Sequence, residues 1–247
     1  MAAPDLELPR LAVAAPGLLA QEARPPAQQP GLRAQGRTAE PLAGAATRPP
    51  LSDRERRRFE QYLGEVLGRL GLDFATPATT DTPRRFLQAL VDATDGYEGD
   101  PKLVTTFPTE CHGGSACELD QVVEGPIPFS ALCEHHALPF IGESYVGYVA
   151  HEEILGISKL TRLVRVVTHR FGVQERMTEQ IADELTRIVS PHGVAVRLVA
   201  HHACTQIRGV REMSARTRTT AYRGVYVRDA ALRREFLELS GVGRGAS

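Results

Sequence analysis

The chain has 247 residues, of which 42% are hydrophobic and 24% are charged, a composition typical of globular proteins. Its formal net charge of −1 argues against a general nucleic-acid-binding surface, and no apolar run is long enough to span a membrane. Since the sequence carries no secretion signal, we expect a cytoplasmic protein whose four cysteines are free or metal-bound.

Residues 1–50 are predicted to form a disordered tail, because they hold nine of the 17 prolines, no aromatic residue and no apolar periodicity. One domain is expected over residues 51–247, with a helical part at 51–100 and a strand-rich part at 118–240. Cys111, His112 and Cys117 lie in a Gly-rich stretch between these parts. For this stretch we favour an exposed loop over a second metal site.

The first predicted elements along the chain are two helices. Ser52 and Glu55 have the spacing of a capping box, and apolar residues then follow helical periodicity as far as Gly71. A second helix is predicted to start with Thr82 as its cap and Pro83 at the first helical position, and to end near Gly96.

Short β-rich runs follow. Residues 121–129 contain two prolines, which favours an edge strand or a bulge, and residues 140–149 read as a regular strand. Two helices are predicted next, one capped by Ser158 and one starting at Val173. Strands at 193–201 and 219–227 and a short helix at 231–239 complete the pattern. This order predicts an α+β fold with a largely antiparallel sheet.

The most informative cluster is Cys133-Glu134-His135-His136. Cys133 and His136 have the spacing that lets one turn present both side chains to one metal ion, and Cys204 is the best third ligand. On a strand, Cys204 and His202 would face the same side. Three ligands with two spare histidines, His135 and His202, indicate an open catalytic site. Core packing and hydrogen-bonded histidines remain alternatives on spacing alone.

A candidate anion site follows. Gly156-Ile157-Ser158-Lys159 reads as the start of a helix, where free N–H groups attract phosphate, and Arg162 shares a face with Lys159. Further basic residues stand at Arg85 and Arg208. Solvated helix-end charge is the plainer interpretation of each of them. Glu175, with Gln174, would suit a guanine edge, although complementing the helix dipole explains Glu175 as well.

Together these motifs resemble type I GTP cyclohydrolase. The resemblance rests on Cys133–His136, on Gly156–Leu160, on Val173–Thr178 and on His202–Gly209, which occur in that family's order, and on an upstream Thr82-Pro83-Arg84-Arg85. It covers roughly residues 51–240. It implies the tunnelling fold, in which antiparallel sheets of several subunits close into a barrel with the catalytic part at 118–240, and it implies a homodecamer with active sites between subunits.

The resemblance also implies site roles and a reaction. Cys133, His136 and Cys204 would bind Zn²⁺, while His135 and His202 would transfer protons. Further residues would bind GTP: Gln174 and Glu175 at the guanine, and Ser158, Lys159, Arg162, Arg208 and a neighbouring subunit's Arg85 at the ribose and triphosphate. Zinc-activated water would attack C8 of the purine, followed by ring opening, loss of formate and closure to 7,8-dihydroneopterin triphosphate.

The sequence departs from the family pattern at Gly172 and Thr205, and in the stretches 121–126 and 216–223. None of these changes removes an expected ligand. Two alternatives remain. One is another tunnelling-fold enzyme of pterin or 7-deazapurine metabolism, which the combination of Cys133, His136 and Cys204 disfavours. The other is a catalytically silent zinc-binding subunit, which would not need His135 or Glu175.

Overall fold

The computed structural model describes residues 48–109, 111 and 120–241. Most of the expected tail, together with His112 and Cys117, lies outside these residues. The described helices are α1 (Asp53–Arg69), α2 (Thr82–Asp92), α3 (Ile157–Thr168), α4 (Gln174–Val189), α5 (Ala203–Gln206), α6 (Val225–Arg228) and α7 (Ala230–Leu239), with short 3-10 turns η1 (Asp95–Glu98) and η2 (Pro101–Val104). No helix in the described part is both long and apolar enough to cross a membrane.

The two N-terminal helices differ in how they begin. At α1 the predicted capping box is confirmed: Ser52 Oγ accepts from the Glu55 N–H, and the Glu55 carboxylate accepts from the Ser52 N–H at 2.9 Å. At α2 the predicted cap is wrong, because Thr82 is already the first helical residue. Its N–H donates to Thr79 O at 2.9 Å, so a preceding turn leads directly into the helix.

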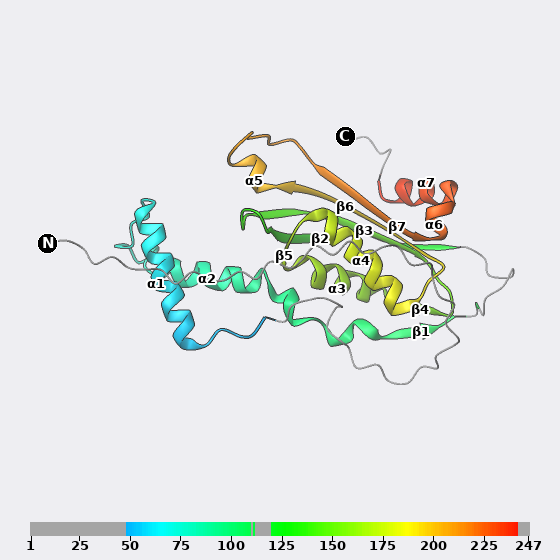
Figure 1. Cartoon of the computed structure of the whole chain (residues 1–247), viewed down its shortest axis with the longest axis horizontal. Helices are drawn as coiled ribbons and strands as arrows, with labels where there is room; N and C mark the ends of the chain where they lie inside the picture. The colour runs from blue at the N-terminus through cyan, green and yellow to red at the C-terminus, as the bar shows by residue number, and fades with distance from the viewer. Residues whose placement is uncertain (1–47, 110, 112–119, 242–247) are drawn as a thin grey trace, which may run out of the picture. The chain divides into compact units, whose positions relative to one another are not determined.

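The central sheet has five strands in the order β5-β2-β3-β6-β7 (Figure 1). Its strands are β2 (Gln121–Cys133), β3 (Pro139–Val149), β5 (Phe171–Gly172), β6 (Gly193–His202) and β7 (Thr217–Gly224), and β1 (Thr106–Pro108) pairs separately with β4 (Glu153–Leu155). All neighbours in the large sheet are antiparallel except β5, which runs parallel to the end of β2. This confirms the predicted α+β class with a largely antiparallel sheet. The predicted irregularity near Pro126 is a register shift between Glu124 and Ile127.

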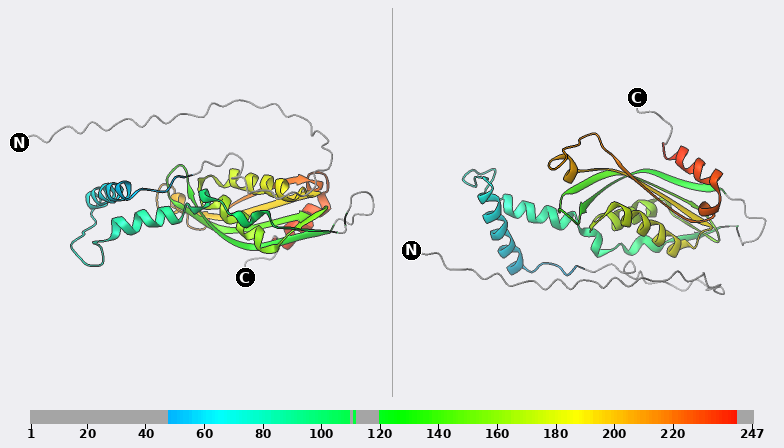
Figure 2. Two further views of the ribbon diagram at one scale, coloured as in Figure 1. Left: turned by 90° about the horizontal axis from the view of Figure 1, so that it is seen from below. Right: turned by 45° about the horizontal axis from the view of Figure 1, so that its top comes forward.

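Helices cover both faces of the curved sheet. Helices α3 and α4 pack on one face, and α6 and α7 lie against the other face near one end (Figure 2). The strand alternation explains this arrangement, because Tyr148 enters the core beneath α3 and α4, whereas Val149 enters the core that contains Phe236 of α7. The sheet therefore presents buried apolar side chains on both faces.

Two predicted boundaries are wrong for physical reasons. The last strand ends at Gly224, not at residue 227, because Gly224 has a φ of 58° and a Cβ there would lie 2.0 Å from His192 O. The chain consequently turns into α6. Helix α3 begins at Ile157 with Gly156 at the cap position, so Ser158 lies inside the first turn and does not cap it.

Candidate functional site

The turn between β2 and β3 carries the Cys-Glu-His-His sequence. The Cys133 N–H donates to Leu138 O at 2.9 Å, and the Ala137 N–H donates back to Cys133 O at 2.8 Å. Ala137 takes a positive φ of 53°, a left-handed conformation that closes the turn tightly. Cys133 is thereby buried at the end of β2, while the three polar residues that follow it are exposed.

The structure brings the three expected ligand residues together. The donor atoms of Cys133, His136 and Cys204 all lie within 4.8 Å of one another, and Cys133 Sγ is 3.7 Å from His136 Nδ1. Strand pairing explains the meeting, because Phe140 at the start of β3 pairs with His202 at the end of β6. Burial and the neighbouring Cys133 sulfur raise the pKa of the Cys204 thiol.

The expected local structure at Cys204 is wrong. The chain leaves β6 after His202 and forms the short helix α5, so His202 and Cys204 do not alternate along one strand. The helical turn still delivers the Cys204 sulfur to Cys133. His135 also lies close, with its Nδ1 at 3.8 Å from Cys133 Sγ, although it is not part of the mutually close donor set.

His202 is fixed on two sides. Its ring stacks on Phe140 with centroids 4.6 Å apart and an interplanar angle of 4°, and its Nε2 lies 2.8 Å from Gln174 Oε1. Burial lowers the pKa of His202, and the charge of Glu175 acts in the opposite direction. The imidazole is therefore held in one orientation and favoured in its neutral form.

Gln174 is a buried residue whose amide is fully used inside the protein. Its Nε2 lies 3.3 Å from Leu198 O, 3.1 Å from Thr217 O and 3.2 Å from Thr219 Oγ1. Carbonyl oxygens only accept, so the amide nitrogen faces them and Oε1 faces His202. His202 Nε2 must then carry the hydrogen, which leaves Nδ1 with the lone pair in the neutral ring.

Glu134, to which the sequence assigns no role, forms a two-point ion pair with Arg176 of α4. The Arg176 nitrogens donate to the two carboxylate oxygens at 2.8 and 3.0 Å. This hydrogen bonding is the main reason why the pKa of Glu134 lies below its usual value. The pair joins the Cys-Glu-His-His turn to the first turn of α4. Sequence reasoning missed it because its members are 42 residues apart.

The expected substrate-binding residues lie on several elements. Glu175 is exposed in the first turn of α4, Lys159 is half-buried in the first turn of α3, and Arg208 is exposed after α5. On α2, Arg85 donates to Ala78 O at 2.5 Å, in the turn that precedes the helix. One chain therefore presents these basic groups on separate elements.

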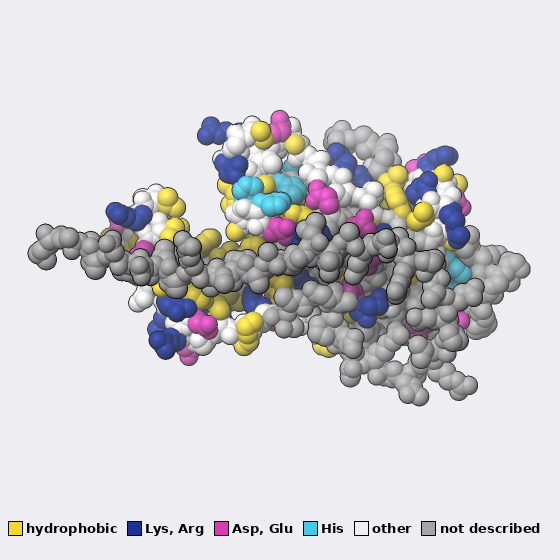
Figure 3. Space-filling view, viewed as in Figure 1, with side chains coloured by type: hydrophobic (Ala, Val, Ile, Leu, Met, Phe, Trp, Pro, Cys, Tyr) yellow, Lys and Arg dark blue, Asp and Glu magenta, His cyan; other side chains and the backbone are white. Residues whose placement is uncertain are grey.

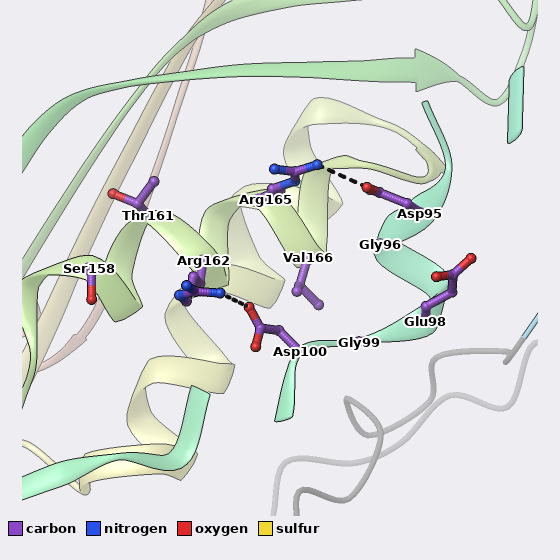
Figure 4. Close-up of a pocket in the computed structure, with 10 residues that line it drawn as sticks. All are labelled: Asp95, Gly96, Glu98, Gly99, Asp100, Ser158, Thr161, Arg162, Arg165 and Val166. Atoms are coloured by element: carbon purple, nitrogen blue, oxygen red, sulfur yellow. Dashed lines mark hydrogen bonds and ion pairs between the residues drawn. The ribbon is translucent and has the colours of Figure 1, made fainter. Parts of the chain in front are cut away.

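Arg162 and Ser158 line a pocket of about 550 Å³ between α3 and the segment 95–100 (Figure 4). In this pocket Arg162 pairs with Asp100 at 2.7 Å, and Arg165 pairs with Asp95 at 2.9 Å. None of the clustered cysteine or histidine donors lines it. The expected site residues thus fall in separate neighbourhoods, among them the Cys133–His136–Cys204 cluster and this pocket of mixed charge.

Histidine side chains gather over the α5 end of the sheet (Figure 3).

The cysteines differ from expectation in one respect: Cys133 and Cys204 are free thiols, but Cys111 is disulfide-bonded rather than free or metal-bound. Of the second metal site considered for Cys111, His112 and Cys117, the latter two residues lie outside the described part of the chain.

Comparisons with known proteins identify the family. The GTP cyclohydrolase I family model matches residues 59–241. The chain is 37% identical over 181 residues to "GTP cyclohydrolase 1" of Campylobacter curvus, covering 73% of this chain and 93% of that protein. It is 38% identical over 192 residues to the protein of the same name from Halalkalibacterium halodurans, covering 76% and 98%.

Among solved structures, the chain is similar to "archaeosine synthase QueF-Like in the apo form" at 14% identity and a TM-score of 0.35, covering 42% of this chain and 92% of that chain. A similarity this low supports no conclusion about fold or function. The family match and the identity to full-length relatives are sufficient without it: the chain belongs to the GTP cyclohydrolase I family.

Proposed function

We propose that this chain is a zinc-dependent GTP cyclohydrolase that converts GTP and water to 7,8-dihydroneopterin triphosphate and formate. One observation carries the proposal within the family: Cys133, His136 and Cys204 converge beside His202. Three protein ligands leave a fourth position open for water, as in catalytic zinc sites, whereas structural sites use four protein ligands.

The donor set fits zinc. Zinc–sulfur and zinc–nitrogen bonds of about 2.3 and 2.05 Å at a tetrahedral angle separate the two ligand atoms by about 3.6 Å. The observed separation of Cys133 Sγ and His136 Nδ1 is 3.7 Å. When bound, zinc would supply an activated water for hydrolysis at the purine C8.

The protein's own residues would move the protons. His202 holds a hydrogen on Nε2 against Gln174, so its Nδ1 is the atom that takes up or releases a proton during turnover. His135, exposed on the turn beside Cys133, is the second proton-transfer candidate. Because the Gln174 amide is hydrogen-bonded to His202, we propose that Gln174 positions the His202 ring and that the exposed carboxylate of Glu175 recognises guanine.

Basic residues would hold the triphosphate and orient the base. Lys159 and Ser158 stand in the first turn of α3, where N–H groups and the helix dipole favour anions. Arg208 follows the zinc-site helix α5. Arg162 would exchange its Asp100 partner for a phosphate oxygen. Remote binding energy of this kind positions the reacting purine without itself taking part in bond making.

A homo-oligomer, by family resemblance a decamer, would complete the site with Arg85 from a neighbouring subunit. Helix α1 supports an oligomer, because it buries none of its residues: Tyr62 and Val66 are each 55% exposed, and Leu70 at its C-cap is 80% exposed. An amphipathic helix with such an uncovered face gains stability by packing against another surface.

The test is to incubate zinc-loaded protein with GTP and measure formate and the fluorescent pterin formed after oxidation. We expect both products, their loss on chelation and their return with zinc. Protein that binds zinc but releases no formate would refute the proposal and favour another tunnelling-fold activity.

Cys204→Ser separates catalysis from a silent structural role. We expect turnover to fall at least a hundredfold while the oligomer, measured by light scattering, stays intact. Collapse of the assembly in this variant would instead support a structural metal in a catalytically silent subunit.

A further inference from the structure

A second group of metal-binding side chains lies away from the candidate active site. The donor atoms of Cys111, His151 and His192 all lie within 4.8 Å of one another. Cys111 Sγ is 3.6 Å from His192 Nε2, and the two imidazole rings have centroids 4.5 Å apart. The three residues come from three segments: the chain after β1, the β3–β4 connection and the α4–β6 connection.

The two clusters lie at opposite ends of the paired strands β3 and β6. His202, beside the first cluster, pairs with Phe140, whereas Gly193, next to His192, pairs with Val149. Nine residues of extended strand at about 3.4 Å each separate these ends by about 30 Å. Figure 3 accordingly shows histidine surface at two separated places. The second cluster cannot contribute ligands to the first.

Backbone and hydroxyl bonds hold the second cluster in place. Thr109 Oγ1 accepts from the Cys111 N–H at 3.2 Å and donates to His151 O. The Thr109 N–H donates to Glu152 O, and the His192 N–H donates to Val149 O, each at 2.9 Å. These bonds fix the three segments without any ion, so the side chains meet because the fold places them together.

The chemistry of the donors suits a borderline-soft divalent ion. One thiolate and two imidazoles are typical zinc ligands, and the 3.6 Å between Cys111 Sγ and His192 Nε2 equals the sulfur–nitrogen separation of about 3.6 Å expected around tetrahedral zinc. All three residues are half-buried, which leaves room for water as a fourth ligand.

Cys111 is disulfide-bonded in this structure, and a disulfide sulfur lacks the thiolate charge that binds zinc. We propose that Cys111, His151 and His192 form a redox-gated site for a zinc-like divalent ion, closed by the disulfide and opened when a thiol reductant cleaves it. Two reductant thiols become one disulfide, while Cys111 and its disulfide partner each become a thiol. Metal binding then releases the Cys111 proton to solvent.

The occupied site would connect the three segments and stabilise that end of the sheet by mass action. In the oxidised protein the disulfide blocks the Cys111 sulfur, and only the backbone and hydroxyl bonds hold the three segments together. The state of this cluster would therefore report the thiol balance around the protein, independently of GTP turnover.

The experiment uses the full-length chain with Cys133→Ser and Cys204→Ser, which remove both sulfurs of the first cluster. Cobalt(II) is the probe, because a bound thiolate produces a sulfur-to-cobalt charge-transfer band. We expect one cobalt per chain with this band after reduction by a dithiol, and no band in the oxidised protein.

Cys111→Ser should abolish the band, and His151→Ala and His192→Ala should each weaken cobalt binding at least tenfold. His201→Ala is the matched control, a half-buried histidine outside both donor sets, and should change nothing. If circular dichroism shows that one alanine variant is unfolded, the other alanine variant and Cys111→Ser still test whether the cluster binds cobalt. A reduced parent without the band, or a band that survives both histidine substitutions, overturns the proposal. Neither outcome bears on GTP hydrolysis, which the wild type tests separately.

Discussion

Replacing Gln174 with Met tests the orientation assigned to His202. Met fills a similar volume but removes all four polar contacts of the Gln174 amide. His202 Nε2–H and Thr217 O lose their partner, whereas Leu198 O also belongs to a strand paired on both sides. The perturbation is therefore local and polar, with little change in packing.

The size of the effect follows from the number of groups left unpaired. A buried polar group without a partner costs about 1–3 kcal/mol, and the half-buried His202 falls at the lower end, whereas Thr217 is exposed and water can replace its lost bond. The free energy of unfolding should therefore fall by about 1 kcal/mol. With its ring released, His202 should transfer protons less effectively, and kcat should fall by about 10–100-fold within the range of general acid–base catalysis.

The assays are urea unfolding at a fixed protein concentration and steady-state kinetics with GTP. Gln180→Met, at an exposed position of the same helix, is the matched control and should resemble the wild type. If the Gln174 side chain bound guanine and did not orient His202, the Gln174→Met variant would show a higher KM for GTP with little change in kcat. That pattern, or unfolding midpoints equal in the two variants, would refute the reasoning.

Two further predictions concern ion pairs. Glu134→Gln should lower stability at pH 7 by less than about 1 kcal/mol, because the Glu134 and Arg176 side chains are 31% and 55% exposed. Since the folded-state pKa of Glu134 is depressed, its contribution to stability is full above about pH 4.3 and is lost as the pH falls through the folded-state pKa. Urea unfolding midpoints of the wild type and Glu134→Gln from pH 3 to 7 check this. A difference between the two midpoints that grows on acidification contradicts it. Asp100→Asn should lower KM for GTP by about 2–5-fold with kcat unchanged, because Arg162 no longer has to break an ion pair worth up to about 1 kcal/mol. Asp95→Asn serves as the control in the same kinetic assay, and an unchanged or higher KM for Asp100→Asn would show that Asp100 positions Arg162 for the substrate.

Local signals predicted the elements, and distant contacts set several of their ends. The capping box at Ser52 could be predicted because both of its partners lie within one turn. The end of β7 could not, since Gly224 turns there to avoid the carbonyl of His192, 32 residues earlier in the chain. Strand propensity continues through Val225 and Tyr226, but the close approach of another segment overrides it.

The candidate site divides in the same way. Clustering of Cys133 and His136, together with a family resemblance, predicts a set completed by Cys204, and the donor atoms of these three residues do lie together. No local pattern marks Gln174 as a partner of His202, because β6 and α4 meet only in the folded chain. Cysteine and histidine side chains that could bind a metal carry a compositional signal, whereas the side chain that orients His202 is a glutamine with no distinguishing local pattern.

The first turn of α4 links the residues of the Cys133–His136 turn to the residue that orients His202. Successive helical residues point about 100° apart, so Gln174, Glu175 and Arg176 reach three different surroundings. Gln174 enters the protein and fixes His202, Arg176 reaches across to Glu134 on the Cys133–His136 turn, and Glu175 stays exposed. A shift of this helix end by one residue would release His202 and the turn together. The start of α4 therefore sets the geometry between His202 and the Cys133–His136 turn, while it presents the carboxylate proposed to recognise guanine.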